Sequence, residues 1–572
     1  MKKEIFRKLR NAVLFLAAVS VSGCGAPAVP LYGLFETEVA NKTRYDNPFA
    51  EVELKSQFVS PSGKKVDFFG FYDGDGKGGQ NGHIWKQRFM PDEVGLWRYK
   101  LSFTDGSPAK DGRFQCVAKG ARPGPWQQDP DNPHWFKTNA EEHFLPLAMF
   151  ANCLFAPINW QDAIGWCKER QYNTLIVSTF NTWVWAKEWE NVLAFVATDT
   201  SKKEMDYDRL NLKMWHEWDR MIQTAGENGI YIGPFNGPKG TYGGRRGKYP
   251  PVELAYWPKI SQGWDAPFNI RLIRYLVARQ GAYWNLAFWN LCNTEMYHHL
   301  NEEQAIRYGE YFASVTPFGR MITAQDIEQW HNKDRRWLSK MDFPSSRKLN
   351  TVQTSVGTLG NPNVGAHIDD ANWQDAYPNN QLALDSYNNF PILTTEGLWE
   401  GQGRAKKPLR IIWGFLTAGA HVMWADWIYD EGIEGHRYGS IGRGWVPVRP
   451  LNEHLFRVDQ LGVDCVGDEQ LKIAVDYLSG LEYWKMNPNN QLVAGSTEAY
   501  CLAQPGRRYT VYAPNGGTVK LDLSGAKGTF SARWLDPRVG GFSQSITIRG
   551  GKWASFEAPD KQDWVLDVAL TK

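Results

Sequence analysis

The fold of the chain is decided by the stretch NLAFWNLCNTE, residues 285–295, in which a mostly apolar run leads into the carboxylate of Glu295. A short apolar run without strict alternation is typical of a strand buried on both faces, as strands of parallel sheets are. Seven more runs of this kind lie along the chain. Together the eight are Leu145–Ala151, Asn173–Thr179, Ile230–Phe235, Asn285–Leu291, Arg320–Ala324, Leu349–Gln353, Pro391–Thr395 and His421–Ala425.

Helical stretches separate these runs. Between the second and third runs, Trp215, Trp218, Ile222 and Ala225 recur at three- and four-residue spacing, which gives a helix one apolar stripe to pack on a sheet. Alternation of strands and helices indicates a parallel sheet built from βα units. Eight units over roughly 300 residues suit a closed (β/α)8 barrel better than an open doubly wound sheet. We therefore predict a TIM-barrel domain over residues 134–488.

A β-rich segment precedes the barrel over residues 31–120. Its β-forming runs at 50–54, 65–69 and 96–101 alternate with Gly, Pro and Asp turns, and no helical period is evident. We predict an immunoglobulin-like β-sandwich, joined to the barrel by a Pro-, Gly- and Asp-rich connector near 121–133. Within it, Asp73–Gly78 resembles the start of a calcium loop, but Lys77 stands at a ligand position, so a glycine-rich hairpin is the better interpretation.

The β-rich pattern returns after the barrel, over residues 490–572. Runs at 508–512, 518–523, 530–534 and 564–566 lie between Gly- and Pro-bearing turns, which predicts a second, smaller β-sandwich. A chain of 572 residues also exceeds the size at which a single core stops growing. The predicted fold class is therefore multidomain, with a central TIM barrel between two β-sandwiches.

The first 23 residues predict export from the cytoplasm. A cationic start precedes an apolar run too short for an ordinary membrane span, which is the pattern of a signal peptide. Val21–Cys24 resembles the bacterial lipobox, so we expect Cys24 to be lipidated and residues 24–30 to form an extended tether. The alternative is an ordinary signal peptide with Cys24 incidental. The expected location is the bacterial cell envelope, anchored in the periplasm or at the cell surface.

The composition argues against a nucleic-acid partner and favours a carbohydrate. Lys plus Arg number 64 and Asp plus Glu number 62, so the chain has no basic field for a phosphate backbone. The 27 Trp residues are unusual, and flat aromatic rings can pack against the apolar faces of sugars. Core packing is the alternative explanation for about half of these residues.

Two glutamates follow strands of the predicted barrel at the end where active sites of such barrels lie. Glu295 follows the fourth run and Glu396 the seventh. Glycoside hydrolysis needs two carboxyls on opposite sides of the anomeric carbon, one to protonate the leaving oxygen and one to attack or to activate water. We predict this pair to be catalytic. Glu400 is the chief rival to Glu396, and either predicted glutamate could instead pair with an arginine or cap a helix.

Several segments resemble those of one known family. They are Gly33–Glu36, Asn47–Phe49, Gly70–Gly74 and Arg88–Trp97 near the N-terminus, Arg274–Arg279 and Trp413–Trp424 in the barrel, and Tyr512–Pro514 and Trp534–Arg538 near the C-terminus. The chain resembles apiosidase-like glycoside hydrolases of clan A, which carry an N-terminal immunoglobulin-like domain of unknown function and a C-terminal module with a collagen-binding label. This resemblance implies a retaining mechanism with Glu295 as acid/base and Glu396 as nucleophile.

One departure from the clan pattern concerns the contact to the sugar's 2-hydroxyl. The clan often has Asn directly before its acid/base, whereas Thr294 stands there in this chain and Asn293 is one place earlier. Either Asn293 still reaches the hydroxyl or the substrate differs at carbon 2.

Amide and indole side chains near the strand ends are the candidate sugar contacts. They are Asn152, Asn181, Asn236, Asn293, Gln325 and Gln353, with Trp399, Trp424 and Trp427 as stacking platforms. Several amides on one face suit recognition of a neutral sugar, although one amide alone more often satisfies loop backbone and one ring alone can be core. Neither His367 with Asp369 and Asp370, nor His298 with His299, has zinc-type spacing, so we expect no metal and no cofactor.

The leading functional hypothesis is hydrolysis of the O-glycosidic bonds of a poly- or oligosaccharide. A polysaccharide lyase is one alternative, and a surface glycan-binding lipoprotein without activity is another. The presence of two strand-end carboxylates favours the hydrolase over the binding protein.

Overall fold

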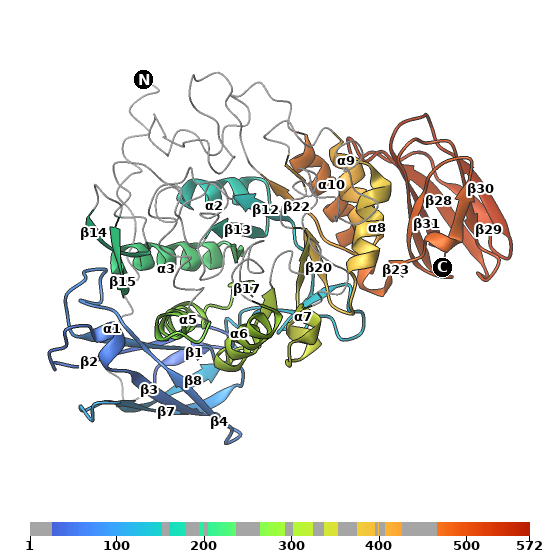
Figure 1. The fold of residues 1–572 in the computed structure, drawn as a ribbon. Helices are drawn as coiled ribbons and strands as arrows, with labels where there is room; N and C mark the ends of the chain where they lie inside the picture. Colours follow the sequence, from blue (N-terminus) through green and yellow to red (C-terminus); the bar gives the residue numbers. More distant parts are fainter. Residues whose placement is uncertain are drawn as a thin grey trace, which may run out of the picture.

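The structure is a computed structural model with a barrel at its centre, an N-terminal β-sandwich beneath it and a C-terminal β-sandwich at its side (Figure 1). It describes residues 26–151, 160–178, 194–199, 204–235, 264–291, 301–323, 337–352, 374–394, 398–399, 407–425 and 466–571. The predicted fold class, a TIM barrel between two β-sandwiches, is confirmed.

Eight parallel strands form the barrel. They are β12 (Ala148–Ala151), β13 (Thr174–Ser178), β16 (Tyr231–Phe235), β17 (Phe288–Asn290), β18 (Met321–Thr323), β19 (Asn350–Val352), β20 (Ile392–Thr394) and β22 (Met423–Ala425). Strand ladders join β12 to β13, β13 to β16, β17 to β18, β19 to β20 and β22 back to β12. The three remaining junctions are single parallel bridges, Ile232–Leu286, Ile322–Lys348 and Leu393–His421. The ring of strands is therefore closed, and each strand lies within one of the eight predicted runs.

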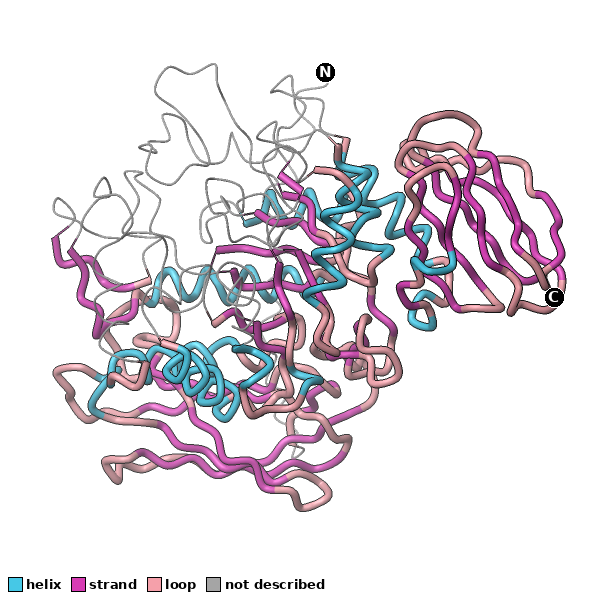
Figure 2. Tube along the Cα trace, turned by 45° about the vertical axis from the view of Figure 1, so that its right-hand side comes forward, coloured by secondary structure: helices cyan, strands magenta, loops and turns pink. Residues whose placement is uncertain are grey.

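A helix follows every strand of the ring. These helices are α2 (Trp160–Glu169), α3 (Leu212–Glu227), α5 (Pro267–Gln280), α6 (Glu302–Val315), α7 (Trp337–Lys340), α8 (Ala376–Ser386), α9 (Pro408–Thr417) and α10 (Gly467–Ser479). The predicted apolar stripe lies on α3, where Trp215, Trp218, Ile222 and Ala225 are all buried. Helix α6 begins with a capping box, in which Asn301 and Gln304 satisfy each other's backbone N–H groups. Figure 2 shows these helices around the strands.

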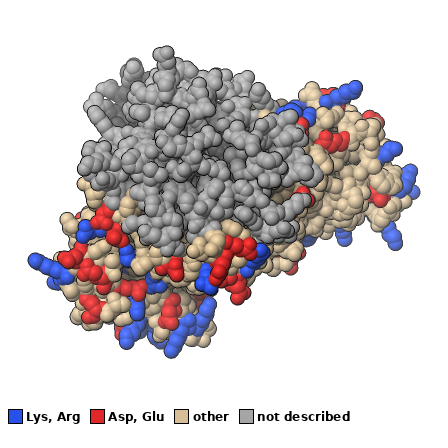
Figure 3. Space-filling view, viewed as in Figure 1, with Lys and Arg blue, Asp and Glu red and all other residues tan. Residues whose placement is uncertain are grey.

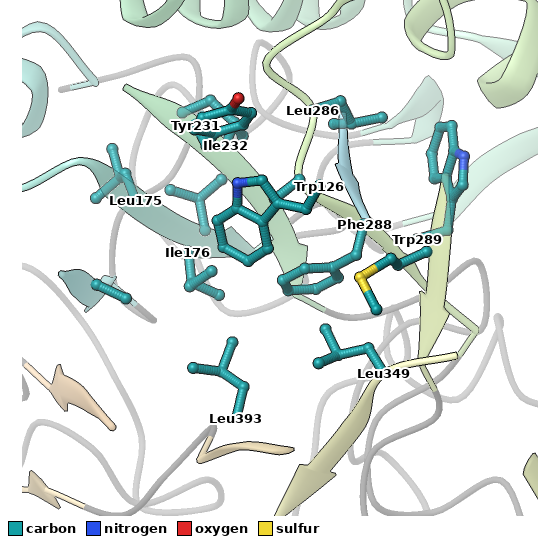
Figure 4. Close-up of a cluster of buried hydrophobic side chains, with 14 of the residues drawn as sticks. Trp126, Leu175, Ile176, Tyr231, Ile232, Leu286, Phe288, Trp289, Leu349 and Leu393 are labelled. Atoms are coloured by element: carbon teal, nitrogen blue, oxygen red, sulfur yellow. The ribbon is translucent and has the colours of Figure 1, made fainter. Parts of the chain in front are cut away.

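The barrel interior is filled by apolar side chains (Figure 4). Inside the barrel, the Phe288 ring lies very close to Gly233. A Cβ atom added at Gly233 would be only 2.9 Å from this ring. Trp126 reaches the same cluster from outside the eight strands, with its ring 6.2 Å from that of Phe288 and 5.5 Å from that of Tyr231. Its side chain is fully buried. The interior is thus a packed core rather than a pore.

The connector predicted near 121–133 contributes structure of its own. Strand β9 (Trp126–Gln128) pairs with β10 (Phe136–Thr138), which pairs with β11 (His143–Phe144). This small sheet contributes Trp126 to the barrel core and Phe136 to the surroundings of His421, whose ring lies 4.6 Å from that of Phe136. It therefore covers the end of the barrel at which the strands begin.

The N-terminal domain consists of two sheets. One has the order β1-β8-β7-β3-β4 and the other β2-β6-β5. Their strands are β1 (Ala28–Pro30), β2 (Phe35–Ala40), β3 (Leu54–Val59), β4 (Lys65–Phe69), β5 (Phe71–Tyr72), β6 (Ile84–Phe89), β7 (Gly95–Phe103) and β8 (Asp111–Val117). The core between the sheets is aromatic, with Phe35 stacked on Phe114 and Phe58 stacked on Phe89.

Two local predictions in this domain are corrected. The predicted tether over 24–30 is wrong for its last three residues, because Ala28–Pro30 pairs in parallel with β8 and Val29 is buried. The predicted β-run at 50–54 is wrong as well. There the Asn47 side chain accepts the backbone N–H of Phe49 and caps a short helix, α1 (Pro48–Glu51), so that β3 starts only at Leu54.

The Asp73–Gly78 stretch is the predicted glycine-rich hairpin loop, since it connects the antiparallel strands β5 and β6. Gly74 has a φ of +58°, which favours glycine. Asp73 is fully buried and binds cationic side chains of the protein rather than presenting a calcium ligand to solvent.

The C-terminal domain also has two sheets, with the orders β23-β25-β26-β31-β28-β29 and β24-β27-β30. The strands are β23 (Asn487–Pro488), β24 (Val493–Gly495), β25 (Tyr500–Gln504), β26 (Arg508–Ala513), β27 (Thr518–Asp522), β28 (Thr529–Leu535), β29 (Ile546–Arg549), β30 (Trp553–Glu557) and β31 (Trp564–Leu570). The domain packs on the barrel through α9, where Trp413 stacks on Tyr512 and Arg410 donates to Asn515.

Five buried charged residues join the N-terminal domain to the barrel. This interdomain ion cluster consists of Asp73, Lys86 and Arg88 of the N-terminal domain with Asp219 of α3 and Arg279 of α5. Arg279 lies between two carboxylates, with Nη1 at 2.8 Å from Asp73 and Nη2 at 2.8 Å from Asp219. Arg88 also binds Asp219. Its Nη1 and Nη2 donate hydrogen bonds of 3.0 and 2.9 Å to the two carboxylate oxygens of Asp219.

The ion pairs keep the two carboxylates of the cluster charged. Burial alone would raise the pKa of Asp219, but Arg279 and Arg88 hold it below its ordinary value. Burial likewise opposes ionisation of Asp73, and Arg279, His216 and Lys86 lower its pKa. Both carboxylates are therefore ionised, and removal of Arg279 would take one buried cationic partner from each of them.

We predict that Arg279→Met destabilises the protein by about 3–5 kcal/mol, because Asp73 and Asp219 would both lose a buried partner. Denaturant unfolding followed by tryptophan fluorescence measures the change. The matched control is Arg307→Met on α6, which breaks an exposed pair with Glu303 and should cost under about 1 kcal/mol. Equal shifts for the two variants would contradict the assignment.

Two buried histidines lie at the end of the barrel that the β9–β11 sheet covers. His421 begins the eighth predicted run and its Nε2 lies 3.1 Å from the backbone oxygen of His134. Burial lowers the pKa of His421 to about 3 and that of His134 to about 4. The structural role predicted for His421 is confirmed, since its ring packs against Trp135 and Phe136.

These histidines should make the fold sensitive to acid. The unfolded chain takes up their protons below the ordinary histidine pKa of about 6.5, whereas the folded chain does so only near pH 4 and pH 3. Stability from the neutral rings is present above pH 6.5 and is lost as the pH falls, by about 1.4 kcal/mol per pH unit for each histidine.

We predict that His421→Gln flattens this dependence. Unfolding free energies measured by urea denaturation at pH 7.5 and pH 5 should show that wild type loses about 2 kcal/mol more than the variant over this interval. His83→Gln, at an exposed position, is the control and should keep the wild-type slope. An unchanged slope in His421→Gln would refute the prediction.

Candidate active site at the carboxyl ends of the barrel strands

Most of the predicted site residues lie outside the described residues. These are Cys24, Asn152, Asn181, Asn236, Asn293, Glu295, Gln325, Gln353, Glu396, Glu400 and Trp427. The structure describes the backbone of Trp399 and the whole of Trp424, together with the strand ends that precede the other barrel positions.

The strands that lead to the two glutamates both belong to the closed ring. β17, the fourth strand, ends at Asn290, and Glu295 comes five positions later in the sequence. β20, the seventh strand, ends at Thr394, and Glu396 comes two positions later. Because all eight strands run parallel, their carboxyl ends meet at one rim of the barrel. The predicted ranks of these strands, four and seven, are confirmed.

The strands before the predicted amides end at the same rim. β12 ends directly before Asn152, β16 directly before Asn236 and β19 directly before Gln353, while β18 ends two positions before Gln325 and β13 three before Asn181. The parallel ladders bring these strand ends together although they are far apart in sequence.

The chain is anchored on both sides of Glu396. Before it, the hydroxyl oxygen of Thr394 accepts the backbone N–H of Met423 at 3.3 Å. After it, strand β21 (Leu398–Trp399) pairs in parallel with β22, with Leu398 opposite Trp424 and Trp399 opposite Ala425. The backbone of Trp399 is therefore held at the carboxyl end of the eighth strand. Glu400 lies beyond this anchored strand in the sequence.

The side chain of Trp424 packs in the core and does not form a stacking platform for a sugar. Its side chain is 1% exposed, and its ring stacks on Trp166 of α2 with 5.4 Å between centroids and 13° between planes. The partner Trp166 belongs to a surrounding helix, so this indole lies on the helix side of β22. Between the two interpretations of Trp424, the structure favours core packing and corrects its assignment as a stacking platform.

Polar side chains near the ends of three neighbouring strands were missed by the sequence analysis. Asn290 on β17 is opposite Thr323 on β18, so both side chains lie on one face, the one that Phe288 presents to the interior. The hydroxyl groups of Thr323 and of Thr351 on β19 form a hydrogen bond of 2.8 Å, and both residues are buried. The signal in the sequence is weak, because the three runs also contain the polar residues Asn285, Arg320, Asn350 and Gln353. These residues form a polar floor beneath the rim.

No described group of three or more His, Cys, Asp or Glu side chains is arranged to hold a metal ion. The candidate clusters at His298 and at His367 lie outside the described residues.

Among the described helices, none is long and apolar enough to span a membrane.

Comparison with protein families matches the two flanking domains. Residues 28–104 match the family described as "Domain of unknown function (DUF5060)", and residues 488–569 match the "Putative collagen-binding domain of a collagenase". A search of curated proteins gave no match. The predicted resemblance of both flanking domains is thus confirmed.

Comparison with solved structures gives a match over nearly the whole chain. A "putative glycoside hydrolase" from Bacteroides vulgatus covers 95% of this chain and 100% of its own length, with 15% identity and a TM-score of 0.67. A glycoside hydrolase family 5 protein from the same species covers 78% of this chain and 93% of its own length, with 16% identity and a TM-score of 0.54. At these identities the likeness shows a shared fold.

Proposed function

We propose that the chain is a glycoside hydrolase that cleaves the O-glycosidic bonds of a poly- or oligosaccharide. The observation that carries the proposal is the closed parallel ring, in which strands four and seven end shortly before Glu295 and Glu396. Barrels of this kind hold their catalytic side chains just past the carboxyl ends of the strands. The shared fold with proteins titled glycoside hydrolases supports the same reaction class.

In the proposed mechanism Glu295 is the acid/base and Glu396 the nucleophile. Glu295 protonates the leaving oxygen, Glu396 attacks the anomeric carbon, and water then releases the sugar with Glu295 acting as base. A nucleophile must hold its position against the substrate closely, because small displacements cost much of the rate. The anchoring of Thr394 and Leu398 to the eighth strand favours Glu396 over Glu400 for this role.

Substrate recognition is proposed to rest on amides and indoles at the same rim. Asn152, Asn181, Asn236, Asn293, Gln325 and Gln353 would hydrogen-bond sugar hydroxyls, and Trp399 and Trp427 would stack on sugar faces. Such a set has no net charge, which suits a neutral glycan. We propose no organic cofactor and no metal for this reaction.

Substitution of the two glutamates tests the function. Glu295→Gln and Glu396→Gln should each lower kcat by a factor of about a thousand or more on a substrate found by screening plant and algal polysaccharides, because each removes one required carboxyl while keeping its shape. Glu400→Gln is the matched control and should retain most of the activity. Product configuration, followed by NMR, should show retention.

Four results would contradict parts of this proposal. Activity that survives both substitutions would exclude the pair, and loss in Glu400→Gln with activity kept in Glu396→Gln would reassign the nucleophile. A product that absorbs as a 4,5-unsaturated uronate would identify a lyase. Glycan binding without turnover in the wild type would identify a binding protein.

We also propose that Cys24 carries a lipid anchor in the cell envelope, on the strength of the lipobox-like sequence before it. Cys24→Ser should move the protein from the membrane to the soluble fraction of a bacterial host and abolish its labelling by a fatty-acid analogue, because the thiol that accepts the lipid is removed. Cys116→Ser, at a buried thiol, is the control for labelling. Labelling that persists in Cys24→Ser would disprove the anchor.

A further inference from the structure

A pocket of about 310 Å³ lies where the N-terminal domain meets the barrel. Its walls come from α1 and β5 of the N-terminal domain and from α5 and β15 (Glu204–Leu210), the second strand of a hairpin with β14 (Phe195–Asp199). The volume lies within the range of small-ligand sites, at its lower end. One or two sugar units would occupy a space of this size.

The walls of the pocket are aromatic on both sides. From the N-terminal domain, the Phe49 ring lies 5.0 Å from Tyr72 at 87°. From the barrel, the Tyr207 ring lies 6.2 Å from Phe268 at 82°. Phe49 and Tyr207 are both partly exposed. Aromatic faces of this kind can pack against the C–H faces of a sugar ring.

Two ion pairs among the lining residues supply polar groups. Arg274 pairs with Glu53 across the domain boundary, and Arg271 pairs with Asp208. Two guanidiniums and two carboxylates offer both donors and acceptors, as sugar hydroxyls require. The carboxylate of Glu51 lines the pocket as well, so the lining carries one more negative than positive charge and disfavours an anionic ligand. Figure 3 shows the same mixture of blue and red over the visible face of the N-terminal domain.

The pocket is preformed by the interdomain ion cluster. Tyr275, which lines it, donates its hydroxyl to the backbone oxygen of Tyr72 at 3.2 Å and accepts from Arg279 at 2.8 Å. On the other side, Asn47 donates to the backbone oxygen of Asp208 at 3.0 Å and fixes α1 against β15. A ligand would therefore bind without ordering this part of the wall, which reduces the entropic cost of binding.

We propose that this interdomain pocket binds a neutral saccharide of one or two units, separately from the site at the strand ends. The β14–β15 hairpin belongs to the connection that leaves the carboxyl end of β13. Four of the six lining residues of α5 lie in the first half of the helix, which follows the connection from β16. The pocket therefore lies on the side of the barrel where the active-site loops emerge. It would hold a distant part of a long glycan.

Hydrogen exchange with mass spectrometry on the full chain tests the proposal. The probes are cellobiose, mannobiose and xylobiose at millimolar concentrations. At least one should slow exchange in residues 47–53, 204–210 and 268–274 together. Ala50→Trp should weaken the apparent affinity, taken from this protection, by about tenfold or more, because Ala50 is an exposed lining residue and an indole there fills the pocket. Lys100→Trp, exposed on β7 of the same domain, should leave it unchanged.

A second variant removes hydrogen-bonding groups instead of filling space. Arg271→Leu breaks the pair with Asp208, in which both side chains are at least one third exposed, so the fold should be retained while protection weakens. Absence of protection with every probe, or protection that survives both Ala50→Trp and Arg271→Leu, would overturn the proposal. The Glu295→Gln variant separates it from the hydrolase proposal, because the protection of these three segments should be unchanged there even if turnover is lost or was never present.

Discussion

The structure depends most on the burial of Arg279 between the carboxylates of Asp73 and Asp219. A guanidinium taken out of water is stable only where its donors are paired, and here the pairs come from two domains. Arg279 is next to the last residue of α5, and the chain turns from there into β17, the strand that precedes Glu295. The N-terminal domain is therefore part of the framework that holds the fourth strand, and not a separate module on a linker.

The two ends of the barrel differ in the side chains that fill them. The end at which the strands begin is closed by the β9–β11 sheet, by Trp126 and by two neutral histidines in an apolar setting. The end at which the strands finish has a floor of Asn290, Thr323 and Thr351. Apolar packing and the polar floor thus lie at opposite ends of the barrel axis, and active sites of this architecture lie at the end where the strands finish.

The sequence was sufficient for features set by local pattern. All eight barrel strands and the buried face of α3 follow from hydrophobic periodicity, because strand and helix repeats differ along a short window. Features set by distant contacts were not accessible in this way. Nothing near Ala28 reveals that β8 pairs with it, nothing near Asp73 reveals Arg279, and an indole at Trp424 has the same sequence signal whether it faces a sugar or Trp166. The glutamates themselves lie outside the described residues, so their predicted roles remain proposals.

The pairing of Ala28–Pro30 with β8 limits how far the N-terminal domain can lie from Cys24. Four peptide units separate Cys24 from Ala28, and a fully extended chain spans at most about 3.6 Å for each, or about 14 Å in all. If Cys24 carries the proposed lipid, the N-terminal sandwich must lie almost against the headgroups. The protein could then not reach far into the surrounding space, and any glycan that it bound would have to come close to the bilayer surface.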